Sequence, residues 1–257
     1  MKIISYKLRE CLQKLLELMS KIYIVGTPIG NLKDITYRAI ETLRQVDWIA
    51  CEDTRVTSKL LSAYDIKKPL VIHNKNNEKS SAKSIIDKLI SNNQSIALVS
   101  DAGMPLVNDP GFEIVKLANA NNIDIEIIPG VSASITAFAL SGLSSTFVYM
   151  GFPKEKEGQR LKQIESFGTE HAYVFYVGNS KIAKFLSEIY KVWNSEATVF
   201  LAREMTKIHE QFYSGNANEV LEELENGSAK GEFTIVVKIE ESKREKVNKY
   251  AAFSKVK

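Results

Sequence analysis

The stretch "YIVGTPIGNLKDIT", residues 23–36, joins an apolar strand to a helix through a turn that holds two glycines and a proline. Turns of this kind often bind a phosphate at the start of the following helix. A Walker loop has the pattern GxxxxGK followed by Ser or Thr, but here an Asn-Leu pair follows Gly30. A dinucleotide fingerprint has the pattern GxGxxG, whereas Thr-Pro-Ile separates Gly26 from Gly30, and Pro28 has no N–H to donate. The sequence therefore argues against a phosphate-binding turn.

Outward from this turn, strand-like and helix-like segments alternate. Apolar, strand-like runs lie at 22–25, 47–51, 70–72, 95–100 and 123–128. Amphipathic stretches with helical spacing separate these runs, a rhythm that predicts βαβ units and a parallel sheet with right-handed crossovers. Small residues at 141–147 predict a linker, and the strand-rich series that follows, with one clear helix at 216–225, predicts a mixed sheet. We therefore predict two α/β domains, residues 21–143 and 144–240.

The bulk composition is that of an ordinary globular protein. Its 257 residues suit two modest domains, and 44% of them are hydrophobic while 25% are charged. A formal net charge of +3 is too small to indicate nucleic-acid binding by itself. The two cysteines form no CxxC pair, which argues against a zinc site and a disulfide framework, and we expect no metal.

The two ends of the chain differ from the predicted domains. Residues 1–20 are interpreted as an N-terminal extension, either a docked helix or a segment ahead of a true start at Met19. Charged residues interrupt the apolar core that a signal peptide needs, and no apolar run is long enough for a membrane span, so we expect a cytoplasmic protein. Residues 241–257 are interpreted as a basic tail, which is either solvated or in contact with phosphate.

Small and acidic residues follow several strands of the predicted parallel sheet. The segments are "CEDTR" at 51–55, "SDAGMPLVNDPG" at 100–111 and "PGVSAS" at 129–134, in addition to the opening turn. The carboxyl ends of parallel strands share one edge of the sheet, where ligands bind. Four such loops on one edge predict a binding site there.

These segments also carry a family resemblance. "TPIGNLKDITYRAIETLRQVDWIACEDTR", "SDAGMPLVNDPG", "PGVSAS", "AREMTKIHEQF" and "KGEFTIVV" occur in the order, and near the spacing, of the bacterial ribosomal RNA small-subunit methyltransferase I family, in the tetrapyrrole-methylase superfamily. The resemblance covers residues 21–239. It implies a homodimeric enzyme with S-adenosylmethionine bound between its two domains. It also implies methyl transfer to the ribose 2′-oxygen of a cytidine in the decoding region of 16S rRNA, in the small ribosomal subunit.

The resemblance assigns cofactor contacts to both domains, with the last two residues of the set in the second. These are Ile29, Asp101, Ala102, Gly103, Leu106, Ser132, Ala133, Val177 and Glu204. The segment "VGNSK" at 177–181 replaces a Glu-Ser-Pro-His-Arg run of many family members. Met104, Asn108 and Val131 stand where Thr, Ser and Pro are expected. We interpret these departures as drift around contacts that the backbone makes.

Methyl transfer to a hydroxyl depends mainly on alignment, and a positioned base can accept the hydroxyl proton. We predict that the catalytic neighbourhood contains Glu52, Asp53 and Arg55, with individual roles open. One acid could instead cap the next helix and pair with Arg55, and Arg55 could hold an RNA phosphate. His73 and His209 titrate in a useful range, but a lone histidine is more often structural.

Two other functions compete with this interpretation. Another methyltransferase of the superfamily would act on a corrin-like ring or on a modified histidine, but such enzymes have a GxGxGD-like opening turn. A non-catalytic ribosome-binding relative would be supported only by the "VGNSK" departure. The exact nucleotide, and the choice between naked rRNA and the assembled subunit, stay open.

Overall fold

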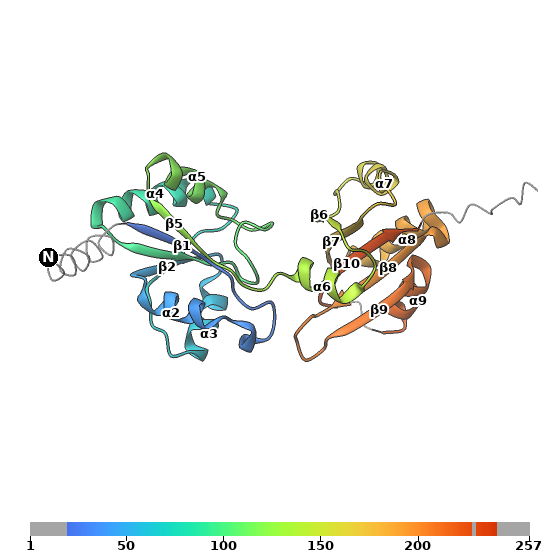
Figure 1. Cartoon of the computed structure of the whole chain (residues 1–257), viewed down its shortest axis with the longest axis horizontal. Coiled ribbons are helices and arrows are strands. Elements are labelled where there is room, and N and C mark those ends of the chain that lie inside the picture. Colours follow the sequence, from blue (N-terminus) through green and yellow to red (C-terminus); the bar gives the residue numbers. More distant parts are fainter. Residues whose placement is uncertain (1–19, 228–229, 241–257) are drawn as a thin grey trace, which may run out of the picture. The chain divides into compact units, whose positions relative to one another are not determined.

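The computed structural model describes residues 20–227 and 230–240 (Figure 1). It divides into two compact units. Unit 1 runs up to Thr136 and also includes Glu204–Glu210, and unit 2 comprises Ala137–Arg203 and the chain from Gln211 onward. The predicted N-terminal extension, apart from Ser20, and the predicted basic tail lie outside the described residues.

Unit 1 is built on a five-stranded sheet with the order β3-β2-β4-β1-β5. Its strands are β1 (Lys21–Val25), β2 (Trp48–Cys51), β3 (Leu70–Ile72), β4 (Ser95–Leu98) and β5 (Asp124–Ile128). Every neighbouring pair is parallel, and Ile22 of β1 lies in register with Ile96 of β4 and Ile125 of β5. The predicted parallel sheet is therefore confirmed.

Helices cover both faces of this sheet (Figure 1). They are α2 (Tyr37–Gln45), α3 (Thr54–Ala63), α4 (Glu78–Asn92) and α5 (Phe112–Ala120), with a 3-10 turn η1 (Leu32–Asp34). The boundary between the two units falls within the next helix, α6 (Ala133–Ser141). Apolar residues of α4 and α5 pack with Ile96 and Leu98, while those of α2 and α3 pack with Ala97 and Val99. Strands that are buried on both faces read as continuous apolar runs, which is why the sequence predicts them clearly.

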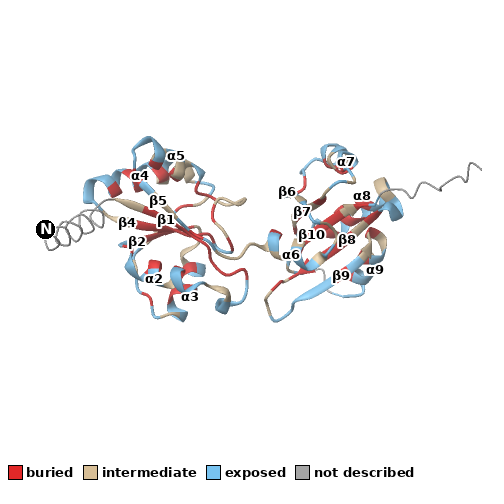
Figure 2. Cartoon of the chain, in the orientation of Figure 1, coloured by how far each residue is buried: buried red, intermediate tan, exposed pale blue. Residues whose placement is uncertain are grey.

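Unit 2 contains a mixed sheet with the order β6-β7-β10-β8-β9. Its elements are β6 (Phe147–Gly151), α7 (Glu157–Glu165), β7 (Ala172–Gly178), α8 (Ile182–Trp193), η2 (Asn194–Glu196), β8 (Ala197–Arg203), β9 (Gln211–Asn216), α9 (Ala217–Glu225) and β10 (Glu232–Ile239). β6 and β7 are parallel, and the other pairs are antiparallel, which confirms the predicted mixed sheet. Buried residues lie along its central strands and under α8 and α9 (Figure 2).

A buried ion pair joins two helices of unit 2. Arg160 on α7 donates to Glu188 on α8, with 2.6 Å between Nη2 and Oε1. Both side chains are nearly buried, at 10% and 7% exposure. The remaining Arg160 nitrogen donates to the carbonyls of Lys154 and Glu155. The charge is thus fully hydrogen-bonded, as burial demands.

Within the described part of the chain, no helix is long and apolar enough to cross a membrane.

Candidate active site

The opening turn is hydrogen-bonded to its neighbouring loops. After β1, the Gly26 amide donates to the Ile128 carbonyl at 3.0 Å. Thr27 and Gly103 exchange two backbone hydrogen bonds, of 2.8 and 3.1 Å, and the Thr27 hydroxyl donates to the Ser100 carbonyl. The amides of Gly26 and Thr27 are thus used inside the protein, which agrees with the absence of a Walker or dinucleotide pattern.

Three strand-end loops meet at a pair of glycines. A Cβ atom on Gly26 would lie 2.7 Å from the Cα of Gly130, closer than real Cβ contacts. The Gly130 amide donates to the sulfur of Met104 at 3.2 Å. Met104 thus makes this loop contact with its thioether where the family resemblance leads one to expect a threonine. The loops after β1, β4 and β5 are therefore fixed against one another.

The loop after β4 has an unusual backbone. Leu106 and Asn108 adopt positive φ angles of 69° and 67°, and Gly103 and Gly111 have φ of 80° and 133°. Side-chain-bearing residues rarely adopt this region, and such strain gathers at functional sites. Glu78 at the start of α4 holds the end of the loop, because its Oε1 accepts from the Gly111 amide at 3.0 Å.

Asp53 caps α3 and pairs with Arg55. Its carboxylate accepts from the Arg55 amide at 2.8 Å and forms a salt bridge with the Arg55 guanidinium. These hydrogen bonds with Arg55 lower the pKa of Asp53 to about 2. The Asp53 amide donates to the Asp101 carboxylate at 3.1 Å. Asp53 therefore has the helix-capping role that the sequence left open. The Arg55 side chain that it holds is 86% exposed.

Glu52 lies among other acids at the same sheet edge. Burial raises its pKa to about 7, and the carboxylates of Asp109 and Asp101 add to the rise. The Lys75 ammonium and a hydrogen bond from the Asp101 backbone oppose it. Burial also raises the pKa of Asp109 to about 6, again opposed by Lys75. Near neutral pH this cluster therefore holds a carboxyl that can accept or release a proton.

Lys75 and Asp109 are site residues that the sequence analysis did not single out. Asp109 lies in the quoted loop 100–111, but its approach to Glu52 depends on that loop's backbone. Lys75 follows β3, a strand of only three residues. The sequence did contain a signal for Lys75. A residue that follows a strand of a parallel sheet lies at the carboxyl edge of that sheet, and the acids lie at the same edge.

His73 positions the loop that carries Lys75. Its amide donates to the Cys51 carbonyl at 2.8 Å, and its Nδ1 lies 2.7 Å from the Ser81 hydroxyl. The side chain is fully buried, and burial lowers its pKa. Asn77 closes the loop by accepting from the Asn74 amide at 2.8 Å. A neutral, enclosed imidazole has a structural role here.

The predicted cofactor residues of the first domain converge in unit 1. Asp101 and Ala102 are exposed at the rim of the loop after β4. A Cβ on Gly103 would lie 3.5 Å from both the Ile29 side chain and the Val131 carbonyl. Ser132 directly precedes α6, which begins at Ala133.

Two further predicted cofactor residues come from later in the chain. Glu204 begins the segment that clusters with unit 1, where the Thr206 hydroxyl accepts from the Asn31 amide at 3.0 Å. Glu204 has a positive φ of 51° and pairs with Lys207 at 3.0 Å. Val177 lies in unit 2, near the end of β7, with its side chain buried.

Residues 21–221 match the family model for tetrapyrrole (corrin/porphyrin) methylases. The chain belongs to the tetrapyrrole methylase family. The match begins with β1 and includes all the strand-end loops described above. The predicted superfamily is therefore confirmed.

No group of His, Cys, Asp and Glu among the residues of the described ranges is arranged to hold a metal ion.

Relatives within the tetrapyrrole methylases share one name. The "Ribosomal RNA small subunit methyltransferase I" of Mycoplasmopsis pulmonis is 45% identical over 224 residues, which are 87% of this chain and 100% of that protein. The protein of the same name from Thermotoga maritima is 42% identical over 222 residues, 85% of this chain and 98% of that protein. The predicted family within the superfamily is confirmed by these relatives.

Solved structures of tetrapyrrole methylases share the fold. Cobalt precorrin-4 methyltransferase matches with a TM-score of 0.63 at 16% identity, over 85% of this chain and 95% of that one. A uroporphyrin-III C-methyltransferase from Thermus thermophilus, in complex with S-adenyl homocysteine, matches with a TM-score of 0.61 at 18% identity, over 84% of this chain and 96% of that one. At these identities the match establishes the fold alone.

Proposed function

We propose that this tetrapyrrole methylase transfers the methyl group of S-adenosylmethionine to the ribose 2′-hydroxyl of a cytidine in the decoding region of 16S rRNA. The observation that carries the proposal is the identity of 38–45% to proteins named ribosomal RNA small subunit methyltransferase I, over most of this chain. The opening turn agrees, because it is closed by internal hydrogen bonds to the loop after β4.

The loops of unit 1 fit one side of such a cofactor. The loop after β4 turns through left-handed conformations at Gly103 and Leu106, and Asp101 is exposed at its start. Ile29 supplies apolar contact next to Gly103. We propose that these residues, together with Ala102, Ser132, Ala133, Val177 and Glu204, bind S-adenosylmethionine. When bound, the cofactor supplies a methyl group that its sulfonium already activates.

We propose Glu52 as the general base and assign Asp53 a positioning role. A base works best when its pKa lies near the working pH, and burial raises the pKa of Glu52 to about 7. Asp53 is engaged by the start of α3 and by Arg55, so it holds the guanidinium in place. Glu52 would accept the hydroxyl proton while the exposed Arg55 contacts a phosphate of the RNA.

The substrate also bears on location and assembly. A small ribosomal subunit as methyl acceptor implies a cytoplasmic enzyme, and the family resemblance supports a homodimer. We therefore propose that this chain acts as a cytoplasmic homodimer.

Transfer of labelled methyl tests the proposed function. Small subunits from cells that lack this gene are incubated with the purified protein and labelled S-adenosylmethionine, and protein-free 16S rRNA is treated in parallel. We expect close to one methyl group to be incorporated per RNA molecule, either in the small subunits or in the protein-free 16S rRNA or in both. If the protein binds the cofactor yet labels neither acceptor, the proposed function is wrong and a non-catalytic or corrin-methylating role becomes the better account.

A further inference from the structure

Helix α3 presents a polar stripe, of which the proposed methyl transfer uses only Arg55. Its members are three and four residues apart, so they share one helical face. All are exposed, whereas Thr57, Leu60 and Leu61 form the buried face. The helix contains no acidic residue. The stripe consists of Arg55, Ser58, Lys59 and Ser62.

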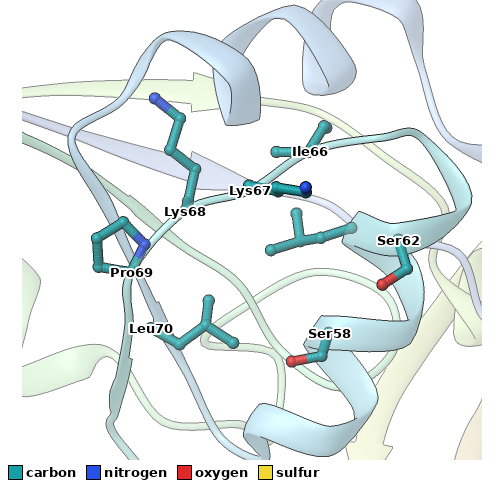
Figure 3. Close-up of a pocket in the computed structure, with 8 residues that line it drawn as sticks. Ser58, Ser62, Ile66, Lys67, Lys68, Pro69 and Leu70 are labelled. Atoms are coloured by element: carbon teal, nitrogen blue, oxygen red, sulfur yellow. The ribbon is translucent and has the colours of Figure 1, made fainter.

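The stripe ends in a groove on the opposite side of unit 1 from Glu52. Asp53 caps α3 at the carboxyl edge of the sheet, while the segment before β3 lies at its amino edge. Figure 3 shows Ser58 and Ser62 on one side of this groove and residues 67–70 on the other. Its volume of about 460 Å³ is typical of ligand-sized cavities. The lining residues are Ser58, Leu61, Ser62, Ile66, Lys67, Lys68, Pro69 and Leu70.

The charges around the groove favour an anion. It is lined by two lysines and two serine hydroxyls and by no acid. Neither Lys67 nor Lys68 forms an ion pair with any residue of the described ranges. Arg44 adds a third cation nearby, since it donates to the Tyr64 carbonyl at 3.0 Å, just after α3. Asp65 is exposed in the same turn but does not line the groove.

The end of α3 offers a simpler explanation for these lysines. Carbonyl groups at a helix C-terminus carry a partial negative charge, equivalent to about half an elementary charge, which attracts cations. Three cations exceed that charge even when the Asp65 carboxylate is counted with it, so the region stays positive overall. If the lysines only complement the helix, their loss would lower stability and leave binding of other molecules unchanged.

We propose that the α3 stripe and its groove bind phosphates along one strand of the rRNA that this enzyme methylates. The inference rests on the proposed function, because it needs RNA as the substrate. Lysine ammonium and serine hydroxyl groups are common phosphate ligands, and such contacts set register without reading sequence. Along α3, Arg55 and the groove residue Ser62 are about 10 Å apart, the rise of roughly three base steps. One RNA strand can therefore contact both ends of α3.

The salt dependence of RNA binding tests the proposal. Each phosphate contact contributes about 0.7–0.9 to the slope of log affinity against log salt. The double variant Lys67→Gln/Lys68→Gln should therefore reduce the slope by about 1.4–1.8 and weaken binding to small subunits about 15- to 30-fold at about 0.15 M KCl. Ser58→Asp, which places a negative charge in the groove, should weaken binding in the same assay. Both variants should keep the affinity for S-adenosylmethionine of the unmodified protein.

A matched control removes two lysines from the other face of the sheet. Lys83 on α4 and Lys116 on α5 are exposed, and neither forms an ion pair with a described residue. Lys83→Gln/Lys116→Gln should leave the slope unchanged. Equal slopes for the two double variants, or an unchanged slope for the groove variant, would overturn the proposal.

Two further outcomes separate the possible failures. Suppose that the unmodified protein binds both small subunits and protein-free 16S rRNA. If the groove variant then loses affinity for the subunits but not for the protein-free RNA, a ribosomal protein occupies the groove and the RNA assignment is wrong. If the unmodified protein binds and methylates neither acceptor, the proposed function itself fails, and this inference with it.

Discussion

Replacing Glu52 with glutamine should slow the reaction and stabilise the protein at the same time. The amide is nearly isosteric, and its oxygen can still accept the hydrogen bond that the Asp101 backbone donates to Glu52. It cannot accept a proton at neutral pH. A lost general base slows an enzyme by roughly 100- to 10,000-fold. The variant should also lack the rise in kcat with pH, through about 7, that the carboxyl confers on the native enzyme.

The stabilisation follows from the buried carboxyl. A pKa raised from 4.5 to about 7 corresponds to at most about 3–4 kcal/mol, at about 1.4 kcal/mol for each tenfold change in proton affinity. Because the carboxyl is only half-buried, screening by water reduces this to about 1–2 kcal/mol. The folded pKa lies above the unfolded one, so the native protein has its full stability below pH 4.5, where the carboxyl is protonated in both states, and loses this amount as the pH rises through about 7. The glutamine variant avoids that loss.

Chemical denaturation at two pH values, beside the kinetic assay, tests both effects. At about pH 8, Glu52→Gln should raise the free energy of unfolding by about 1–2 kcal/mol, and at about pH 4 it should change it little. Glu41→Gln, the same change at an exposed position of α2, serves as the control and should alter neither rate nor stability. A variant with full activity, or one with no gain at high pH, would refute the assignment of Glu52.

Three other substitutions probe how the fold holds the site. Gly26→Ala places a Cβ 2.7 Å from the backbone of the facing PG turn and should lower the free energy of unfolding by about 1–3 kcal/mol, whereas Gly158→Ala in α7, with open space around it, should not. Glu78→Ala removes the acceptor for the amides that begin α5 and should weaken S-adenosylmethionine binding severalfold in calorimetry; unchanged affinity would mean that the loop holds its shape without Glu78. Arg160→Met removes the bidentate partner of the buried Glu188, leaving only Lys184 at 4.0 Å, and should lower the free energy of unfolding by about 3–5 kcal/mol. The added change Glu188→Leu should restore most of it.

The sequence predicts unit 1 well because its strands are buried on both faces. Segments such as β4 (Ser95–Leu98) read as uninterrupted apolar runs, and the loops after them carry the small and acidic residues of the site. Of the helices in unit 2, only the one at 216–225 was predicted, and α7 and α8 were missed. The signal for α8 was present, because its buried Ile182, Phe185 and Ile189 recur at helical spacing.

The arrangement within the site depends on features that no local pattern encodes. Glu52 and Asp53 are adjacent acids, and only the capping geometry of α3 shows which one is engaged by Arg55. The approach of Asp109 to Glu52 requires the loop after β4 to turn through left-handed conformations at two residues with side chains. Long-range packing imposes that backbone, so the sequence could name the neighbourhood but not the roles.

The most direct test of the central claim is where the transferred methyl group resides. Labelled 16S rRNA from the transfer assay is hydrolysed with alkali, which cleaves only where a free 2′-hydroxyl adjoins the phosphate. A methyl group on a ribose 2′-oxygen blocks that cleavage, so the label should appear in a single alkali-resistant dinucleotide that begins with cytidine. Label that is released in mononucleotides would place the methyl on a base and contradict the account.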